Sequence, residues 1–105
     1  RDRYIFAAAF DSDPKKIGKR LPCGLVIESD DHMMKTVRAH GVEIGVITTP
    51  RKAAQRVADS LMDAGVKAIL NFAPVQVRPR KYCTVENVDF TVKLEHLVYH
   101  LGKVP

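Results

Sequence analysis

The chain has 105 residues and a formal net charge of +5, with 46% hydrophobic and 28% charged residues. This length suits one domain with a single core, and the composition argues against a disordered chain. The basic residues are scattered rather than gathered in one stripe, so the charge does not indicate a DNA-binding surface. Two isolated cysteines without metal-type spacing are typical of a reducing cytoplasm. No apolar run approaches the about 20 residues that span a bilayer, and the first residues do not form a signal peptide, so we expect a cytoplasmic protein without a membrane partner.

Strands and helices alternate along the predicted chain. Strands are predicted where apolar, mostly β-branched or alanine-rich runs end at turn residues: 5–10, 25–27, 44–48, 68–72 and 84–87. Helices are predicted where a capping residue precedes apolar side chains at helical spacing, starting at Asp13, at Ser29 or Asp30, at Thr49 and at Asp89. Three glycines end the first three of these helices: Gly18, Gly41 and Gly65.

This alternation predicts an α/β sheet of parallel strands. In a dinucleotide-binding sheet the first strand lies in the middle, in the order 3-2-1-4-5, and its turn carries the glycines that meet the pyrophosphate. The chain has no such motif, and its first strand ends at Asp11, an acid that belongs at the end of the second strand. The predicted fold is therefore a Rossmann-like, mostly parallel sheet that lacks the first strand and the glycine-rich turn. We expect a hole between the strands that end at Asp11 and Thr48, unless the two strands pair directly.

Four segments carry the most informative sequence. They are residues 6–14 (FAAAFDSDP), residues 43–55 (EIGVITTP followed by AAQ), residues 65–74 (GVKAILNFAP) and residues 85–90 (VENVDF). In order and spacing these segments resemble the carboxyl-terminal domain of the Rex redox-sensing transcriptional repressors. The pieces ILNFAP and VENVD are specific to that family, whereas a strand that ends in Asp is shared by many nucleotide-binding folds.

The resemblance implies a bacterial homodimer in which an amino-terminal winged helix reads operator DNA and a carboxyl-terminal domain senses the ratio of NADH to NAD. In that family NADH binding releases the repressor from its operator. Residues 1–88 would be a partial NAD(H)-binding domain, and residues 89–105 a helix exchanged with the partner subunit. The chain lacks the winged helix and the glycine-rich turn. We therefore do not expect it to bind DNA, and the missing turn counts against NADH binding by this chain alone.

Asp11 is the first candidate for a nucleotide-binding residue. An acid at the carboxyl end of a parallel strand can accept hydrogen bonds from both hydroxyls of a ribose, worth about 1.5 to 3 kcal/mol. Its charge would repel a 2′-phosphate, which favours NAD over NADP. The alternative is that Asp11 only supports the turn at Asp13 and Pro14.

Six further candidates follow two predicted strands at the place where ligands enter open α/β sheets: Thr49, Pro50, Asn71, Phe72, Ala73 and Pro74. Helix capping alone would explain Thr49 and Pro50. Asn71 could hold the ligand or tie down the backbone of its own loop.

Asp89 and Phe90 are candidates through the resemblance only. It places their counterparts near the nicotinamide pocket of the partner subunit, where a carboxylate could sense the positive charge that the ring has in NAD and loses in NADH. A capping acid and a core phenylalanine would explain both residues as well. His96 and His100 share a helix face at a spacing that can bind zinc, but no third ligand is evident, so we predict no metal site.

Three functions follow from these patterns. The first is the ligand-sensing and dimerisation domain of a Rex-type repressor, without catalysis. The second is a CoA- or nicotinamide-binding domain of an enzyme of related fold, such as succinyl-CoA synthetase. An oxidoreductase needs a proton donor or acceptor at the nicotinamide, and no Lys, His or Tyr follows the strand that ends before Thr49 and Pro50. The third is a dimerising fragment that binds no ligand.

Overall fold

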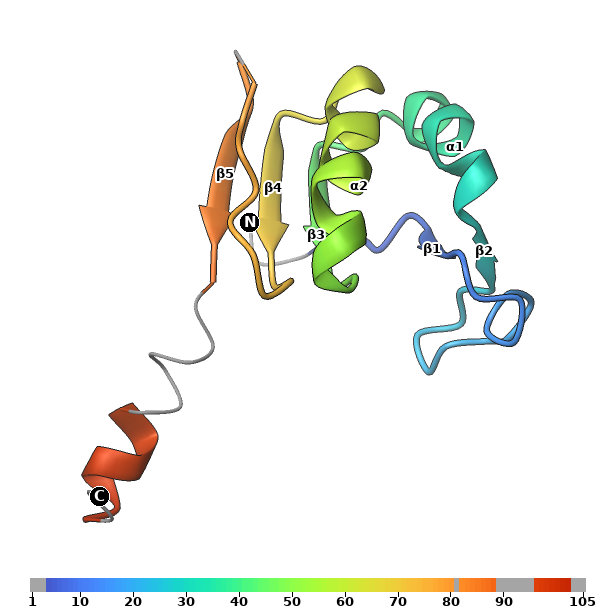
Figure 1. Cartoon of the computed structure of the whole chain (residues 1–105). Helices are drawn as coiled ribbons and strands as arrows, with labels where there is room; N and C mark the ends of the chain where they lie inside the picture. The colour runs from blue at the N-terminus through green and yellow to red at the C-terminus, as the bar shows by residue number, and fades with distance from the viewer. Residues whose placement is uncertain (1–3, 81, 89–95, 103–105) are drawn as a thin grey trace.

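The computed structural model describes residues 4–80, 82–88 and 96–102 (Figure 1). The described residues contain five strands: β1 (Ala9–Asp11), β2 (Ile27–Ser29), β3 (Ile44–Ile47), β4 (Ala68–Asn71) and β5 (Thr84–Asn87). Three helical elements accompany them: the 3-10 helix η1 (Asp30–His32), α1 (Met33–His40) and α2 (Arg51–Asp63). Residues 96–100 are also helical. Every ladder between the strands is parallel, so the predicted parallel α/β fold is confirmed.

The described strands form two separate sheets. β1 pairs with β2, so that Asp11 stands opposite Ser29. β3, β4 and β5 form the second sheet in that order, with Ile47 opposite Asn71 and Asn71 opposite Asn87. No ladder joins β1 to β3. The hole predicted between these strands is therefore confirmed, and the alternative of direct pairing is wrong.

The first strand is much shorter than its apolar run predicted. β1 begins only at Ala9, and Tyr4, Ile5 and Phe6 are 84%, 91% and 71% exposed. β2 pairs with Ala9–Asp11 alone, and residues 4–8 belong to no ladder. A strand needs partners for its backbone N–H and C=O groups, and apolar side chains are buried only when a second layer covers them. The prediction of a buried strand over residues 5–10 is therefore wrong for residues 5–8.

Two further boundaries differ from the sequence predictions. The helix predicted over 13–18 is a single turn, in which two backbone N–H groups donate to the carbonyl oxygen of Asp13. The strand predicted over 25–27 becomes β2 two residues later, because Arg20 and Val26 pair antiparallel in a hairpin that precedes it.

The residues predicted to start and end the longer helices agree with the structure at Ser29, Gly41 and Gly65. The hydroxyl oxygen of Ser29 accepts a hydrogen bond from the backbone N–H of Asp31 at 3.2 Å, so Ser29 is the cap at the start of the helical segment. Gly41 and Gly65 follow the ends of α1 and α2 with φ values of 58° and 102°, a conformation that costs glycine little.

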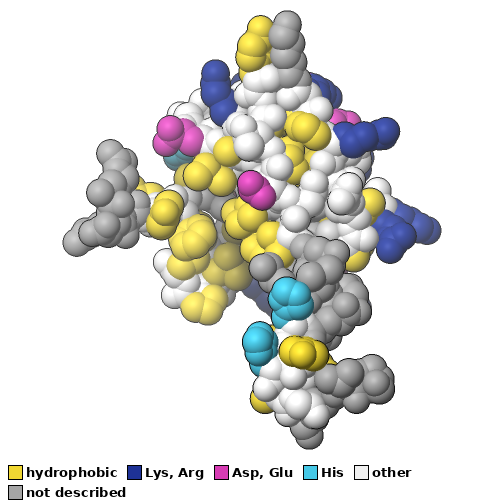
Figure 2. All heavy atoms as spheres, turned by 90° about the vertical axis from the view of Figure 1, so that its left-hand side faces the viewer, with side chains coloured by type: hydrophobic (Ala, Val, Ile, Leu, Met, Phe, Trp, Pro, Cys, Tyr) yellow, Lys and Arg dark blue, Asp and Glu magenta, His cyan; other side chains and the backbone are white. Residues whose placement is uncertain are grey.

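α2 lies against one face of the sheet formed by β3, β4 and β5, and α1 packs beside α2 on the side of β1 and β2 (Figure 1). The buried hydrophobic residues are Met33, Val37, Ile47, Ala54, Ala58, Leu61, Val66, Ile69, Ala73 and Val77. The opposite face is more open. Ile44 and Val46 alternate with the buried positions of β3 and are 53% and 54% exposed. Figure 2 shows hydrophobic side chains exposed together on the β5 side of the molecule.

Gly45 allows α2 to pack closely on β3. A Cβ atom at this position would lie 2.7 Å from Cδ1 of Leu61, a side chain that is 7% exposed. We expect Gly45→Ala to lower the free energy of unfolding by about 1–3 kcal/mol through overpacking, and Leu61→Ala by about 2–5 kcal/mol through a cavity. In the double variant the new methyl group partly fills that cavity, so the combined loss should be smaller than the sum. Urea denaturation of the parent, the two single variants and the double variant tests this prediction. If the losses in the free energy of unfolding are strictly additive, the two residues are not in contact.

Candidate functional site

The carboxyl ends of β3, β4 and β5 share one edge of their sheet. The backbone N–H of Phe72 donates to the carbonyl of Ile47 at 2.8 Å, and that of Val88 donates to the carbonyl of Asn71 at 2.9 Å, so the alignment continues past the strand ends. The predicted site residues that share this edge are Thr49, Pro50, Asn71, Phe72, Ala73 and Pro74. Their contact with a ligand remains a prediction.

Asn71 is the buried polar residue of the described structure, with a side chain 0% exposed. Its Nδ2 donates to the carbonyl of Val75 at 2.7 Å and to Oδ1 of Asn87 at 2.9 Å, and its Oδ1 accepts from the N–H of Ala73 at 3.0 Å. Both donors and one acceptor position are thus used inside the protein. Of the two roles that the sequence allowed, the structure shows Asn71 tying down its loop.

Asn87 completes this arrangement from the neighbouring strand. Its Oδ1 also accepts from the N–H of Val77 at 2.9 Å, and its Nδ2 donates to the carbonyl of Val77 at 3.3 Å. Val77 is 1% exposed and belongs to the core. The two amides therefore hold the loop after β4 in place. Asn87 is not among the predicted site residues; the signal that could have found it is that two strands end in Asn, a residue depleted in strands.

Thr49 does not cap α2. Its hydroxyl donates to the carbonyl of Pro50 at 3.2 Å, Pro50 itself occupies the N-cap position, and no side chain caps the helix. The prediction that Thr49 caps the helix is therefore wrong, whereas Pro50 does stand at the start of α2, one position earlier than predicted. The first turn contains Arg51 and Lys52 and no acidic residue, although a helix N-terminus favours negative charge.

Asp11 occupies the predicted position at the carboxyl end of β1. Its Oδ1 accepts a hydrogen bond from the backbone N–H of Asp13 at 2.9 Å, which is the turn-supporting role that the sequence offered as the alternative. A carboxylate has a second oxygen that can accept from a ribose hydroxyl, so the two roles are compatible. Asp11 and the residues at the edge of β3 and β4 belong to different sheets. Its contact with a ribose remains a prediction.

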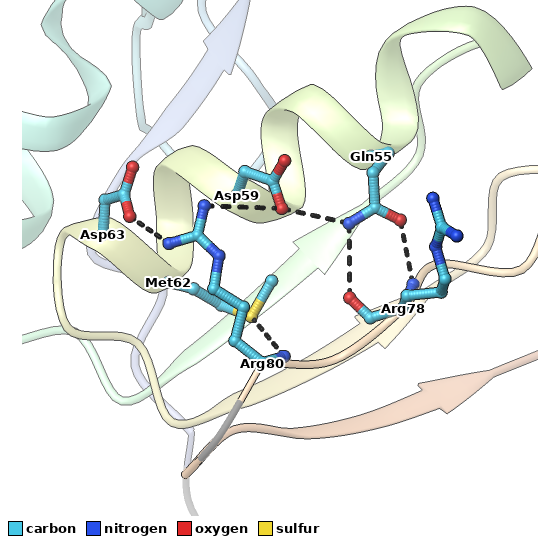
Figure 3. A network of polar contacts seen from close by, with 6 residues as sticks. All are labelled: Gln55, Asp59, Met62, Asp63, Arg78 and Arg80. Carbon is cyan, nitrogen blue, oxygen red and sulfur yellow. Dashed lines mark hydrogen bonds and ion pairs between the residues drawn. The ribbon is translucent and has the colours of Figure 1, made fainter.

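The loop after β4 is also bound to the outer side of α2 (Figure 3). Gln55 holds the backbone of Arg78 with two hydrogen bonds, one accepted by its Oε1 at 2.9 Å and one donated by its Nε2 at 3.2 Å. The guanidinium of Arg80 pairs with Asp63 and, at 3.6 Å, with Asp59. The hydrogen bond to Asp63, followed by the charges of both acids, raises the pKa of Arg80. Solvent screens these exposed ion pairs, so their contribution to stability is small.

Asp89, Phe90 and the predicted start of the last helix lie outside the described residues. His96 and His100 are exposed on the helical residues 96–100. Among the residues that the structure describes, no three His, Cys, Asp or Glu side chains gather as metal ligands do. Within the same part of the chain, no helix has the length and apolar character to cross a membrane.

The two cysteines differ in exposure. Cys23 is exposed, whereas Cys83 is partly buried and its burial raises the pKa of its thiol. Because the thiolate is the reactive form, Cys83 holds less of it at a given pH. We expect iodoacetamide at mildly alkaline pH to modify Cys23 before Cys83, with the difference lost in urea. Peptide mass spectrometry at successive times measures the rates at which iodoacetamide modifies Cys23 and Cys83. Equal rates in the folded protein would contradict this prediction.

Known proteins of similar sequence agree with this fold. A family model described as the CoA binding domain matches residues 1–75. The chain is 54% identical over 99 residues to a protein of Syntrophobacter fumaroxidans named redox-sensing transcriptional repressor Rex, and the match covers 94% of the chain and 47% of the relative. The chain thus spans about half the length of the curated relatives that it matches.

Two solved structures of one protein, RSP, a Rex-family repressor, have a similar fold. The structure of RSP in complex with β-NAD+ and operator DNA matches with a TM-score of 0.80 and 27% identity, over 92% of this chain and 44% of RSP. The structure in complex with β-NADH matches with a TM-score of 0.79 and 28% identity, over 90% of this chain and 45% of RSP. By its sequence and its parallel α/β fold, the chain belongs to the CoA binding domain family, as a homologue of the Rex redox-sensing transcriptional repressors.

Proposed function

We propose that this chain is the NAD(H)-sensing and dimerisation domain of a redox-responsive transcriptional repressor. The observation that carries the proposal is the 54% identity, over 94% of the chain, to a protein named as such a repressor. RSP, which shares the fold, binds β-NADH in one structure and β-NAD+ with operator DNA in another. NADH binding to this domain would release the repressor from its operator, which a winged-helix domain outside this chain would contact.

The nucleotide would bind where the two sheets face the unfilled position between β1 and β3. Ligands of open α/β folds bind beyond the carboxyl ends of the strands at the point where the strand order reverses. Asp11 would accept hydrogen bonds from the ribose on one side. On the other side lies the edge of β3 and β4, with Thr49, Pro50 and residues 71–74. The Asn71 amide would act there by holding the loop, because its side chain is 0% exposed.

The proposed homodimer would form through the C-terminal helix. Leu97, Tyr99 and Leu101 are 61%, 68% and 70% exposed, which supports a partner subunit that covers this part of the chain. The proposed domain catalyses no reaction and acts in the cytoplasm, where a repressor meets both DNA and the NADH pool.

Asp89 would distinguish the two forms of the nicotinamide ring. A carboxylate near the ring stabilises the positive charge of NAD+, which NADH lacks. We expect Asp89→Asn to weaken NAD+ binding more than NADH binding and so to change the ratio of the two affinities. The comparison requires a dimer that binds both nucleotides, and Glu95→Gln on the same segment is the charge-matched control. An unchanged ratio in Asp89→Asn would rule this role out.

Calorimetric titration tests the proposed function. The ligands are NADH, NAD+ and CoA, and the proteins are this chain and a chimera that adds the strand–helix unit preceding the matched segment of the Syntrophobacter relative. Tighter binding of NADH than of NAD+ by the chimera would support sensing. Binding of CoA alone would instead support the family's CoA-binding function, as in an enzyme such as succinyl-CoA synthetase. The absence of any binding by the chimera would refute both.

A further inference from the structure

Two side-chain amides hold the loop after β4 in the same way. Asn87 accepts a hydrogen bond from the N–H of Val77 at 2.9 Å and donates one to the carbonyl of the same residue at 3.3 Å. Gln55 accepts from the N–H of Arg78 at 2.9 Å and donates to its carbonyl at 3.2 Å. A planar amide that is held at both its oxygen and its nitrogen cannot rotate without breaking one of these two bonds. The orientation of both amides is therefore fixed.

The two amides differ in what their remaining N–H group does. An amide nitrogen carries two N–H donors. The second N–H of Gln55 donates to Oδ1 of Asp59 at 3.0 Å, so both of its donors are used. The further hydrogen bond of Asn87 goes to its oxygen instead, because Oδ1 also accepts from Nδ2 of Asn71 at 2.9 Å. One N–H of Asn87 is therefore without a partner among the residues that the structure describes.

This N–H lies at the edge of the sheet where a ligand is expected. Asn87 is the last residue of β5 and stands opposite Asn71, the last residue of β4. Ligands of open parallel sheets bind beyond these carboxyl ends. The Asn71 side chain is 0% exposed, whereas Asn87 is exposed. Asn87 thus presents an accessible donor whose orientation is set before a ligand arrives, which lowers the entropic cost of binding.

The position of β5 narrows the chemical group that this donor would meet. A dinucleotide-binding sheet has two halves that each bind one mononucleotide, and the acid in the first half binds the ribose of the adenosine. Asp11 belongs to the half that β1 and β2 form, which leaves β3, β4 and β5 for the nicotinamide mononucleotide. β4 separates β5 from β3, so β5 is distant from the central position where the pyrophosphate binds. The polar group at the far end of this mononucleotide is the carboxamide, whose oxygen is a neutral acceptor that suits a neutral N–H donor.

We propose that the free N–H of Asn87 donates a hydrogen bond to the carboxamide oxygen of the bound nicotinamide ring. This inference rests on the proposed NAD(H)-sensing function and adds a binding residue to it. NADH and NAD+ carry the same carboxamide, so the contact raises the affinity for both forms. The three hydrogen bonds that Asn87 makes inside the protein hold its amide in the orientation that this contact needs.

Calorimetric titration of the chimera with two matched ligands tests the contact. The ligands are NADH and its thionicotinamide analogue, in which sulfur, a weaker acceptor, replaces the carboxamide oxygen. We expect the parent to bind NADH about 2- to 12-fold more tightly than the analogue, the range for one hydrogen bond between neutral groups. In Asn87→Asp this preference should disappear, because an oxygen replaces the amide nitrogen. The other oxygen still accepts from Asn71 and Val77, so most of the loop contacts remain.

Two further variants separate the contact from other effects of the change. Gln76→Glu adds the same charge at an exposed position of the same loop and should keep the preference of the parent for NADH. Asn87→Ala removes the donor without adding a charge and should lose the preference. Damage to the loop alone would lower the affinities for both ligands together and leave their ratio unchanged.

The outcomes distinguish this inference from the function on which it rests. Equal affinities of the parent for NADH and the thionicotinamide analogue would overturn the inference and leave the sensing function intact. An undiminished preference for NADH in Asn87→Asp and Asn87→Ala would do the same. The absence of nucleotide binding by the parent chimera would overturn the proposed function and this inference with it.

Discussion

Asn71→Asp is expected to lower the free energy of unfolding by at least about 3 kcal/mol near neutral pH. The change keeps the shape of the side chain but replaces a donor by an acceptor. The new carboxylate oxygen would face two oxygens, the carbonyl of Val75 and Oδ1 of Asn87, which now lie 2.7 Å and 2.9 Å from the Asn71 nitrogen. A buried carboxylate is costly when one of its oxygens faces two acceptors and only the N–H of Ala73 donates to the other oxygen.

The loss should depend on pH in a defined direction. Burial and the facing oxygens would raise the carboxyl pKa of the Asn71→Asp protein above the value of about 4 that it has when unfolded. A raised pKa means that the folded state binds the proton more tightly, so the relative stability is greatest below pH about 4 and falls as the pH rises through the folded-state pKa. Urea denaturation across this range measures the effect. Gln76→Glu, an exposed amide on the same loop, is the matched control and should show little change. A loss independent of pH would contradict the role given to the Asn71 nitrogen.

Asp11→Ala is expected to weaken NADH binding by about 10- to 150-fold, the equivalent of 1.5 to 3 kcal/mol for hydrogen bonds to a charged group. The measurement uses the chimera that carries the upstream strand–helix unit. Asp11→Asn is the more informative variant, because an amide oxygen still accepts the hydrogen bond from the N–H of Asp13 and so keeps the turn intact. Asp11→Asn removes the negative charge. We expect it to lower NADH affinity less than Asp11→Ala does and to weaken the discrimination against NADPH.

Asp13→Asn controls for a change of charge near β1, since Asp13 lies beyond the strand end and accepts from the N–H of Lys15. It should leave NADH affinity within about twofold of the parent, because the amide oxygen still accepts from the N–H of Lys15 and a charge on a partly exposed side chain has a small effect. Equal losses of NADH affinity in Asp11→Asn and Asp13→Asn would mean that the affinity depends on the overall negative charge of this loop and not on a contact made by Asp11. An unchanged affinity in Asp11→Ala would remove Asp11 from the site.

Much of the candidate site followed from strand ends that the sequence marks. β5 has the predicted bounds, and β3 and β4 each differ by one residue at the carboxyl end. Because parallel strands end at the same edge, placing Thr49 and Asn71 near one another needed only their positions after apolar runs. The role of Asn71 could not be predicted from the sequence. A buried amide can hold a loop or a ligand, and the tertiary structure decides which groups lie within hydrogen-bonding distance of it.

The sequence by itself determined the parallel α/β class and the helix ends before Gly41 and Gly65. It narrowed the helix cap to Ser29 or Asp30 and predicted an unfilled strand position with direct pairing as the alternative, and the structure then selected Ser29 and excluded that pairing. These features depend on local chemistry: a side-chain cap, a residue that tolerates positive φ, and an order of strands in which one member is missing. Only the tertiary structure decided that β1 starts at Ala9, that Pro50 replaces Thr49 as the N-cap of α2, and that Asn71 and Asn87 share one amide network. Strand length and side-chain pairing depend on neighbours distant in the chain, and an apolar run such as residues 5–8 cannot form a strand where no neighbour supplies hydrogen bonds.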